Sequence, residues 1–192
     1  RRQGMPVVIA VLDIVNPYFR TKDSAAQLEA AGIDVIASPY ANTNLDIPAL
    51  PEQIYRVCRD FDTYAVIDVG GDDQGAVALG RYRPEILAED NFDMLFVANA
   101  YRPLTRTPQE ALEVMRQIEE AGGIPFTGIV NNANLGEETT AEHVMHGEAF
   151  CQSLSALCGL ELVMTSARED LCGLLQGKVE HLLPLRLQDK YY

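Results

Sequence analysis

The stretch AVIDVGGDD, residues 65–73, gives the clearest indication of the fold. In it an apolar run ends at Asp68, and two glycines and two further aspartates follow. A short, nearly continuous apolar run is typical of a strand that is buried on both faces of a parallel sheet. A carboxylate at the end of such a strand can hold the hydration shell of Mg²⁺, which keeps most of its waters. We therefore interpret Asp68 as a metal-site candidate, and Gly70 and Gly71 as positions where a backbone N–H can approach a phosphate.

Other apolar runs of the same type lie on both sides of this stretch. They cover residues 6–12, 33–37, 94–98, 127–130 and 161–164. Helical patterns alternate with them, at residues 24–31, 51–60, 75–87, 107–121 and 139–157. The last two open with the capping-box sequences Thr107–Glu110 and Thr139–Glu142. This alternation predicts one α/β domain with a doubly wound, largely parallel sheet, whose polar strand ends share one edge where ligands bind.

Two asparagines, Asn131 and Asn132, follow the run at 127–130. A side-chain amide offers a donor and an acceptor, which matches the N6/N1 or N6/N7 edge of adenine. A turn rich in asparagine is the alternative interpretation. The same alternative applies to Asp72 and Asp73, which could bind a metal or water or could cap the helix that follows. Residues 99–103 and 165–166 are further polar strand ends at this edge.

The segment DIVNPYFR, residues 13–20, follows the first apolar run. Asp13 could position an attacking water, and Arg20 could meet a phosphate or a carboxylate of a partner. Tyr18 and Phe19 are unusual in a plain loop, because exposed aromatic side chains need something to cover them. We predict that they belong to a subunit interface. The alternative is that both rings fold back onto the core.

Composition excludes several classes of function. The net charge of −13 argues against a surface that binds nucleic acid or anionic membranes. No apolar run approaches the roughly 20 residues that span a bilayer, and the apolar stretch 182–187 is too short and proline-broken for a membrane-targeting helix. The four cysteines form no CxxC pair, so we expect reduced thiols in a cytoplasmic protein.

Several segments together resemble the ParA/MinD/CobQ group of deviant-Walker P-loop ATPases, and more narrowly a MinD-like bacterial subfamily. They are DIVNPYFR at 13–20, DVGGDDQGA at 68–76, NAYRPLT at 99–105, VNNANL at 130–135 and ETT at 138–140. The resemblance spans roughly residues 6–165. It implies an ATP-binding, Mg²⁺-dependent fold and a homodimer with nucleotides between the subunits. It further implies that Asp13 assists hydrolysis, Asp68 is the Walker B carboxylate, Gly71 is the switch glycine, and Asn131 or Asn132 contacts the base.

Two features depart from the family pattern. The 192 residues contain no GxxxxGK[ST] loop, which provides most of the phosphate and Mg²⁺ binding, and Val11 stands where the group has the first aspartate of a DxD pair. We therefore expect an N-terminally incomplete ATPase domain that lacks its first strand and P-loop helix. By itself it should bind ATP weakly or not at all, and when complete it should hydrolyse ATP slowly. The alternatives are a pseudo-ATPase that acts as a protein-interaction module, and an ATP-dependent ligase of the dethiobiotin-synthetase or cobyrinate-amidase kind.

Overall fold

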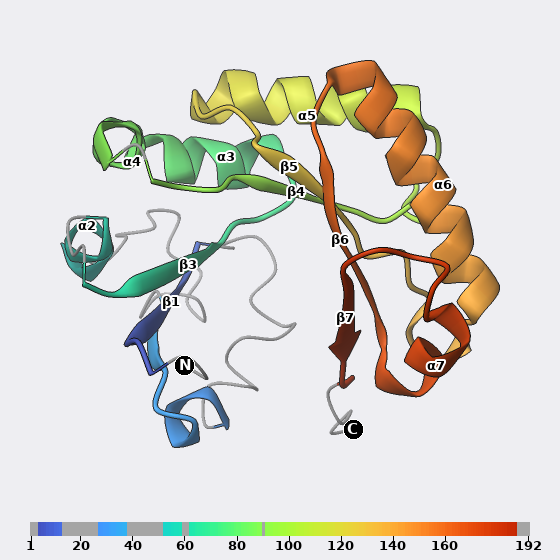
Figure 1. Cartoon of the computed structure of the whole chain (residues 1–192). Coiled ribbons are helices and arrows are strands. Elements are labelled where there is room, and N and C mark those ends of the chain that lie inside the picture. The colour runs from blue at the N-terminus through green and yellow to red at the C-terminus, as the bar shows by residue number, and fades with distance from the viewer. Residues whose placement is uncertain (1–3, 13–26, 38–51, 59–61, 90, 188–192) are drawn as a thin grey trace. The chain divides into compact units, whose positions relative to one another are not determined.

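The structure is a computed structural model that describes residues 4–12, 27–37, 52–58, 62–89 and 91–187 (Figure 1). The segment 13–20, with Asp13 and the two aromatic residues predicted for an interface, lies outside these ranges. Every strand pair in the described chain is parallel, so the expected mixed α/β class with parallel strands is confirmed. The chain divides into two compact units, residues 1–92 with 120–124 and residues 93–119 with 125–192. None of the described helices is long and apolar enough to cross a membrane.

The first unit is built on a three-stranded sheet in the order β2–β1–β3. Its elements are β1 Val7–Val11, β2 Asp34–Ala37, α2 Glu52–Val57, β3 Tyr64–Asp68, α3 Asp73–Gly80 and α4 Arg83–Glu89. The central strand is β1, whose Ile9 pairs with Val35 on one side and Val66 on the other. Ala10 and Leu12 are fully buried, so the core of this unit lies along β1.

The helix expected at residues 75–87 is two helices, and that prediction is wrong. α3 ends at Gly80 and α4 begins at Arg83. Pro84 has no N–H and disfavours helical backbone in the residue before it, so one continuous helix here would lose a hydrogen bond. Between the helices, Tyr82 is 1% exposed and its ring centroid lies 4.6 Å from that of Tyr55 in α2. The break therefore places a large aromatic side chain in the core.

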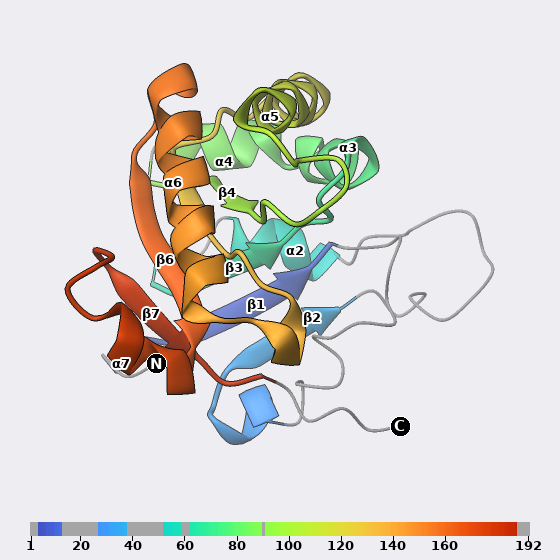
Figure 2. The same cartoon turned by 90° about the vertical axis from the view of Figure 1, so that its right-hand side faces the viewer.

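The second unit is built on a four-stranded sheet in the order β4–β5–β6–β7. Its elements are β4 Leu95–Ala98, most of α5 Pro108–Gly122, β5 Gly128–Asn131, η1 Gly136–Glu138, α6 Ala141–Cys158, β6 Leu162–Arg168, η2 Glu169–Leu171, α7 Cys172–Leu175 and β7 Leu182–Leu185, where η marks a 3₁₀ helix. α6 packs against β5 and β6, and α7 packs against β7 (Figures 1 and 2). A cluster of Val144, Ala167, Leu171, Leu175 and Val179 fills the space between them.

β6 is longer than its apolar run predicts. The run ends at Met164, but the strand continues to Arg168, so Thr165 and Ser166 lie inside β6 and not after it. The pairing with β5 also shifts by one residue between Ile129 and Val130, where β6 carries an extra residue. Such a bulge is not visible in the sequence, because it depends on the partner strand.

β7 has no counterpart among the apolar runs identified in the sequence. It contains Pro184, which normally argues against a strand. Among the described strands, β7 is an end strand of its sheet, and Pro184 pairs with Ala167 of β6. The Thr165 N–H donates to the His181 oxygen at 3.2 Å, so by alternation the nitrogen of Pro184 faces away from β6. The proline therefore removes no ladder hydrogen bond.

Capping boxes begin both long helices, one of them a residue later than predicted. At α5, the Thr107 N–H donates to the Glu110 carboxylate at 2.9 Å and the Glu110 N–H donates to Thr107 Oγ1 at 3.2 Å. At α6 the N-cap is Thr140, and its reciprocal partner is His143, whose Nδ1 accepts from the Thr140 N–H at 3.1 Å. Thr139 is instead buried in the preceding turn.

Candidate functional site

The carboxyl end of β3 carries the first part of the candidate site. Asp68 is the last residue of β3 and is exposed, and its backbone oxygen accepts from the Leu12 N–H at 2.7 Å. Gly70 packs against the helix that follows, because a Cβ at Gly75 would come within 2.5 Å of the Gly70 oxygen. A Cβ at Gly71 would meet nothing within 4 Å. The loop is thus closely packed at Gly70 and open at Gly71, the position predicted to approach a phosphate.

Asp72 caps α3. Its Oδ1 accepts from the Gly75 N–H at 2.9 Å, and its backbone is extended as N-cap residues require. Of the two interpretations of Asp72, helix capping is therefore confirmed. Among the residues that the structure describes, no group of three or more His, Cys, Asp and Glu side chains is placed to hold a metal ion. A Mg²⁺ role for Asp68 stays a prediction, and Mg²⁺ typically uses only one or two protein carboxylates.

A buried hydrogen-bond network joins the ends of β5 and β6 to α6. Asn131 is fully buried, and its Nδ2 lies 3.1 Å from the Val144 oxygen and 3.4 Å from Thr165 Oγ1. Its Oδ1 accepts from the Ala133 N–H at 3.1 Å. Thr165 in turn donates a short hydrogen bond to the carboxylate of Glu148 in α6. Because both ends of the Asn131 amide are satisfied inside the chain, this asparagine has no accessible group to offer a base.

Asn132 has a different environment. It is half-buried, and its Oδ1 lies 2.7 Å from the hydroxyl of Ser166. Its backbone N–H donates to the Ala98 oxygen at 2.8 Å, and its backbone oxygen accepts from Asn134 Nδ2 at 2.8 Å. No residue in the described part of the chain accepts a hydrogen bond from the Asn132 Nδ2. The structure thus separates two asparagines that the sequence left as alternatives, because within the described residues the Asn131 amide is fully bonded and the Asn132 amide nitrogen is not.

The loop after β4 is held at the same edge of this sheet. Asn99 Nδ2 donates to the Asn134 oxygen at 3.2 Å, and Asn99 Oδ1 accepts from the Tyr101 N–H at 3.1 Å. The Tyr101 hydroxyl donates to the His143 oxygen at 3.4 Å, and its ring also contacts the ring of His146. Burial raises the pKa of Tyr101 above its ordinary value. The polar segment at 99–103 therefore organises a turn.

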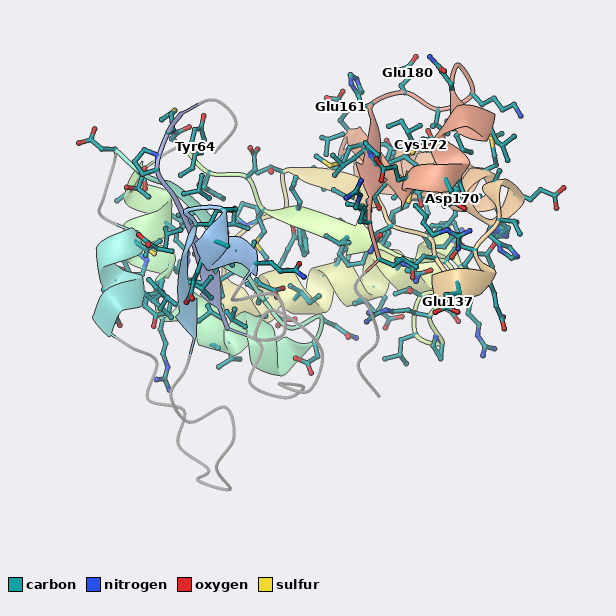
Figure 3. All side chains as sticks on the ribbon, turned by 90° about the horizontal axis from the view of Figure 1, so that it is seen from below. Tyr64, Glu137, Glu161, Asp170, Cys172 and Glu180 are labelled. Carbon is teal, nitrogen blue, oxygen red and sulfur yellow. The ribbon has the colours of Figure 1, made fainter. Side chains whose placement is uncertain are left out.

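A shallow depression of about 450 Å³ lies beyond the ends of β6 and β7. It is lined by Arg168, Glu169, Asp170, Leu185, Arg186 and Leu187. Arg168 forms a two-pronged ion pair with Asp170, at 2.5 and 2.8 Å, and donates to the Glu137 backbone oxygen at 2.8 Å. Asp170 and Glu137 are labelled in Figure 3. The hydrogen bond from Arg168 lowers the pKa of Asp170. Arg186 pairs with Glu169 at 2.8 Å, so all four charged side chains of the depression have partners.

Sequence reasoning missed two residues of this edge. Ser166 was noted only as part of a polar strand end, and its contact with Asn132 spans 34 residues. Glu148 lies in the middle of α6, where a single carboxylate in a helical pattern gives no signal of burial. Only the packing of α6 on the strands reveals it, because 17 residues separate Glu148 from Thr165.

Comparisons with known proteins add little to this description. No protein-family model matches the sequence, and no curated protein matches it. Among solved structures, the chain is similar to the H351A mutant of a D-threo-3-hydroxyaspartate dehydratase, with 17% sequence identity and a TM-score of 0.42. The match covers 95% of this chain and 51% of the dehydratase, so this chain spans about half of that protein's length. At this level of similarity the match assigns neither a fold family nor an activity.

Proposed function

We propose that this chain is part of a nucleotide-binding ATPase of the ParA/MinD type. In this proposal Asp68 holds the hydration shell of Mg²⁺, Gly70 and Gly71 form the switch loop, and Asn132 contacts the base. The complete protein is a slow, Mg²⁺-dependent ATP switch that dimerises when ATP is bound. The proposal rests on the motifs shared with that family and on the local geometry of the segments that carry them.

The observation that carries the proposal is the sequence of elements around β3. A parallel strand ends in an exposed aspartate, a glycine pair follows, and Asp72 caps a helix. Glycine at position 71 suits a backbone N–H that approaches a phosphate, because it has no side chain to stand in the way. This is the arrangement that a Walker B strand and its switch require.

Open strand edges supply further support. Within the described ranges, β3 is an end strand that pairs only with β1, and β4 is an end strand that pairs only with β5. β3 is apolar, yet its Tyr64 and Val66 are 57% and 53% exposed. An apolar edge strand without proline normally pairs with another strand. In the family, a phosphate-binding strand lies beside the Walker B strand. In this proposal β3 is the Walker B strand, and its open edge is where such a strand would pair.

The test uses the complete product of the gene and a fluorescent ATP analogue. We expect binding that needs Mg²⁺, and slow hydrolysis. Asp68→Asn should abolish the Mg²⁺ dependence together with the activity. Asp13→Ala should keep binding but stall turnover, because a group that positions water acts mainly in the transition state.

Two results would count against parts of this proposal. If the complete product does not bind nucleotide in a Mg²⁺-dependent way, the proposed ATPase function is wrong. The alternative of a pseudo-ATPase that acts as a protein-interaction module then applies. An unchanged hydrolysis rate in Asp13→Ala would show that the role given to Asp13 is wrong. The coding sequence before the codon for Arg1 gives an independent check, since a GxxxxGK[ST] within about 40 residues, the length of one βα unit, agrees with the proposal.

A further inference from the structure

Two adjacent residue pairs at the ends of β5 and β6 face in opposite directions. Asn131 pairs with Thr165 in the sheet register, and this pair joins the buried network with Glu148. The next residue of each segment, Asn132 and Ser166, forms the second pair. Because side chains alternate along extended strands, the second pair lies on the face of the sheet away from α6. Its amide is the one available to a ligand.

The backbone around Asn132 is held on both sides. Its N–H donates to the Ala98 oxygen and its oxygen accepts from Asn134, each at 2.8 Å. Only the side-chain torsions of Asn132 remain to be set. Ser166 contacts that side chain and is itself 5% exposed, so its hydroxyl must find a partner inside the protein.

The side-chain oxygen of Asn132 is the end of the amide that faces Ser166. The hydroxyl oxygen lies 2.7 Å from the Asn132 side-chain oxygen and 3.3 Å from the Asn131 backbone oxygen. The Asn132 side-chain oxygen carries no hydrogen, so the Ser166 hydroxyl is the donor in the shorter contact. Ser166 therefore donates to Asn132 Oδ1, and both hydrogens of Asn132 Nδ2 point away from Ser166.

We propose that Ser166 is a positioning residue that fixes the polarity of the Asn132 amide, so that this edge recognises a hydrogen-bond acceptor on its ligand. This inference rests on the proposed nucleotide-binding function and specifies it. The recognised group is a purine ring nitrogen, and the exocyclic amine contributes little. The affinity for a purine should then depend on its ring nitrogens and only weakly on its exocyclic amine.

The first arm of the test uses the ligand-free, ¹⁵N-labelled protein and NMR. Ser166→Ala should shift the side-chain amide signal of Asn132, while the amide signal of the buried Asn131 stays in place. Ser153→Ala is the matched control, because Ser153 is an exposed serine of α6 whose hydroxyl bonds to the Ala149 oxygen. An Asn132 signal that does not respond to Ser166→Ala would overturn the positioning role.

The second arm adds nucleosides at millimolar concentration to the complete product of the gene, labelled in the same way, and follows the same signal. Adenosine and purine riboside, which lacks the exocyclic amine, should bind within about twofold of each other. The analogues 1-deaza-adenosine and 7-deaza-adenosine each lack one ring nitrogen. One of the two should bind at least about fivefold more weakly than adenosine, because one hydrogen bond is lost. Ser166→Ala should weaken adenosine about fivefold, and Asn132→Asp should abolish binding because a carboxylate cannot donate.

The outcomes separate the two proposals. Strong loss of purine riboside, or adenosine binding that survives Asn132→Asp, would contradict recognition of an acceptor by Asn132, and the inference would be wrong while nucleotide binding stands. If no nucleoside moves any signal at this edge, the proposed function fails and acceptor recognition fails with it. The ligand-free arm still decides whether Ser166 holds Asn132.

Discussion

Gly147 of α6 lies directly over the side chain of Asn131 at the end of β5. A Cβ at position 147 would collide with the Asn131 side-chain oxygen and with the Ala133 side chain. The missing side chain is what lets α6 approach the strands closely enough for the Val144 oxygen to bond Asn131 and for Glu148 to meet Thr165. A glycine in mid-helix normally costs about 1 kcal/mol relative to alanine, so close packing has to offset that cost.

Gly147→Ala should therefore destabilise the protein in spite of its better helix propensity. Overpacking of a buried site costs about 1–3 kcal/mol, which for a chain of this size lowers Tm by roughly 2–12 °C. Thermal unfolding followed by circular dichroism measures the change. Gly173→Ala in α7 is the matched control, since a Cβ there meets nothing within 4 Å. A Gly147→Ala variant as stable as Gly173→Ala would contradict the described packing.

Cys151 should resist alkylation in the folded protein. It is 1% exposed, and burial, with a smaller contribution from the charge of Glu148, raises the pKa of its thiol from 9.0 to about 12. At pH 8 the thiolate fraction is then about one in ten thousand, against about one in ten for an ordinary thiol. Iodoacetamide labelling with peptide mass mapping should modify Cys172, which is only half-buried, well before Cys151. Equal labelling rates without denaturant would contradict the prediction.

The ion pair between Asp170 and Arg168 should make the stability of the folded state depend on pH in the acid range. The hydrogen bond from Arg168 lowers the pKa of the carboxyl below 3.8, so the folded state is stabilised above that value and loses the contribution as pH falls through the lowered pKa. Asp170→Asn should lower Tm slightly at pH 7, and the gap to the parent protein should close below about pH 4. Glu180→Gln, at an exposed carboxylate near β7 (Figure 3), is the control. A gap that is constant from pH 7 to pH 2 would show that the ion pair does not act on stability.

Thr140 should be the residue whose hydroxyl starts α6. Its Oγ1 accepts from the His143 N–H at 3.3 Å, so Thr140→Ala should cost about 1 kcal/mol and lower Tm by roughly 2–4 °C. Thr140→Ser keeps the hydroxyl and should stay close to the parent protein. Equal losses in the alanine and serine variants would mean that the methyl group, and not the cap, carries the effect.

Much of the fold follows from signals that act over a few residues. The apolar runs predict β1 to β5 within one or two residues, and the start of α5 follows from Thr107 and Glu110, three residues apart. The same kind of signal placed Asp68 at a strand end and Gly70 and Gly71 beyond it. These features are local because strand and helix patterns depend on neighbours along the chain.

Tertiary structure decided what local patterns leave open. β7 forms in spite of Pro184 because it is an end strand, and α3 and α4 separate where Tyr82 enters the core. Glu148 becomes part of a network only because Gly147 lets α6 approach β5 and β6. Each depends on which element packs beside it, and the sequence near these residues carries no record of that partner.

The adjacent residues Asn131 and Asn132 show the same difference between what the local sequence determines and what the tertiary structure decides. The sequence by itself placed Asn131 and Asn132 at the end of a strand and made both of them candidates. The choice between them depends on the register of β6, in which the pairing runs from Ile129–Leu162 to Val130–Met164 and skips one residue. That bulge puts Thr165 beside Asn131 and Ser166 beside Asn132. Without it Thr165 would meet Asn132, because a one-residue shift moves every side chain to the other face of the sheet.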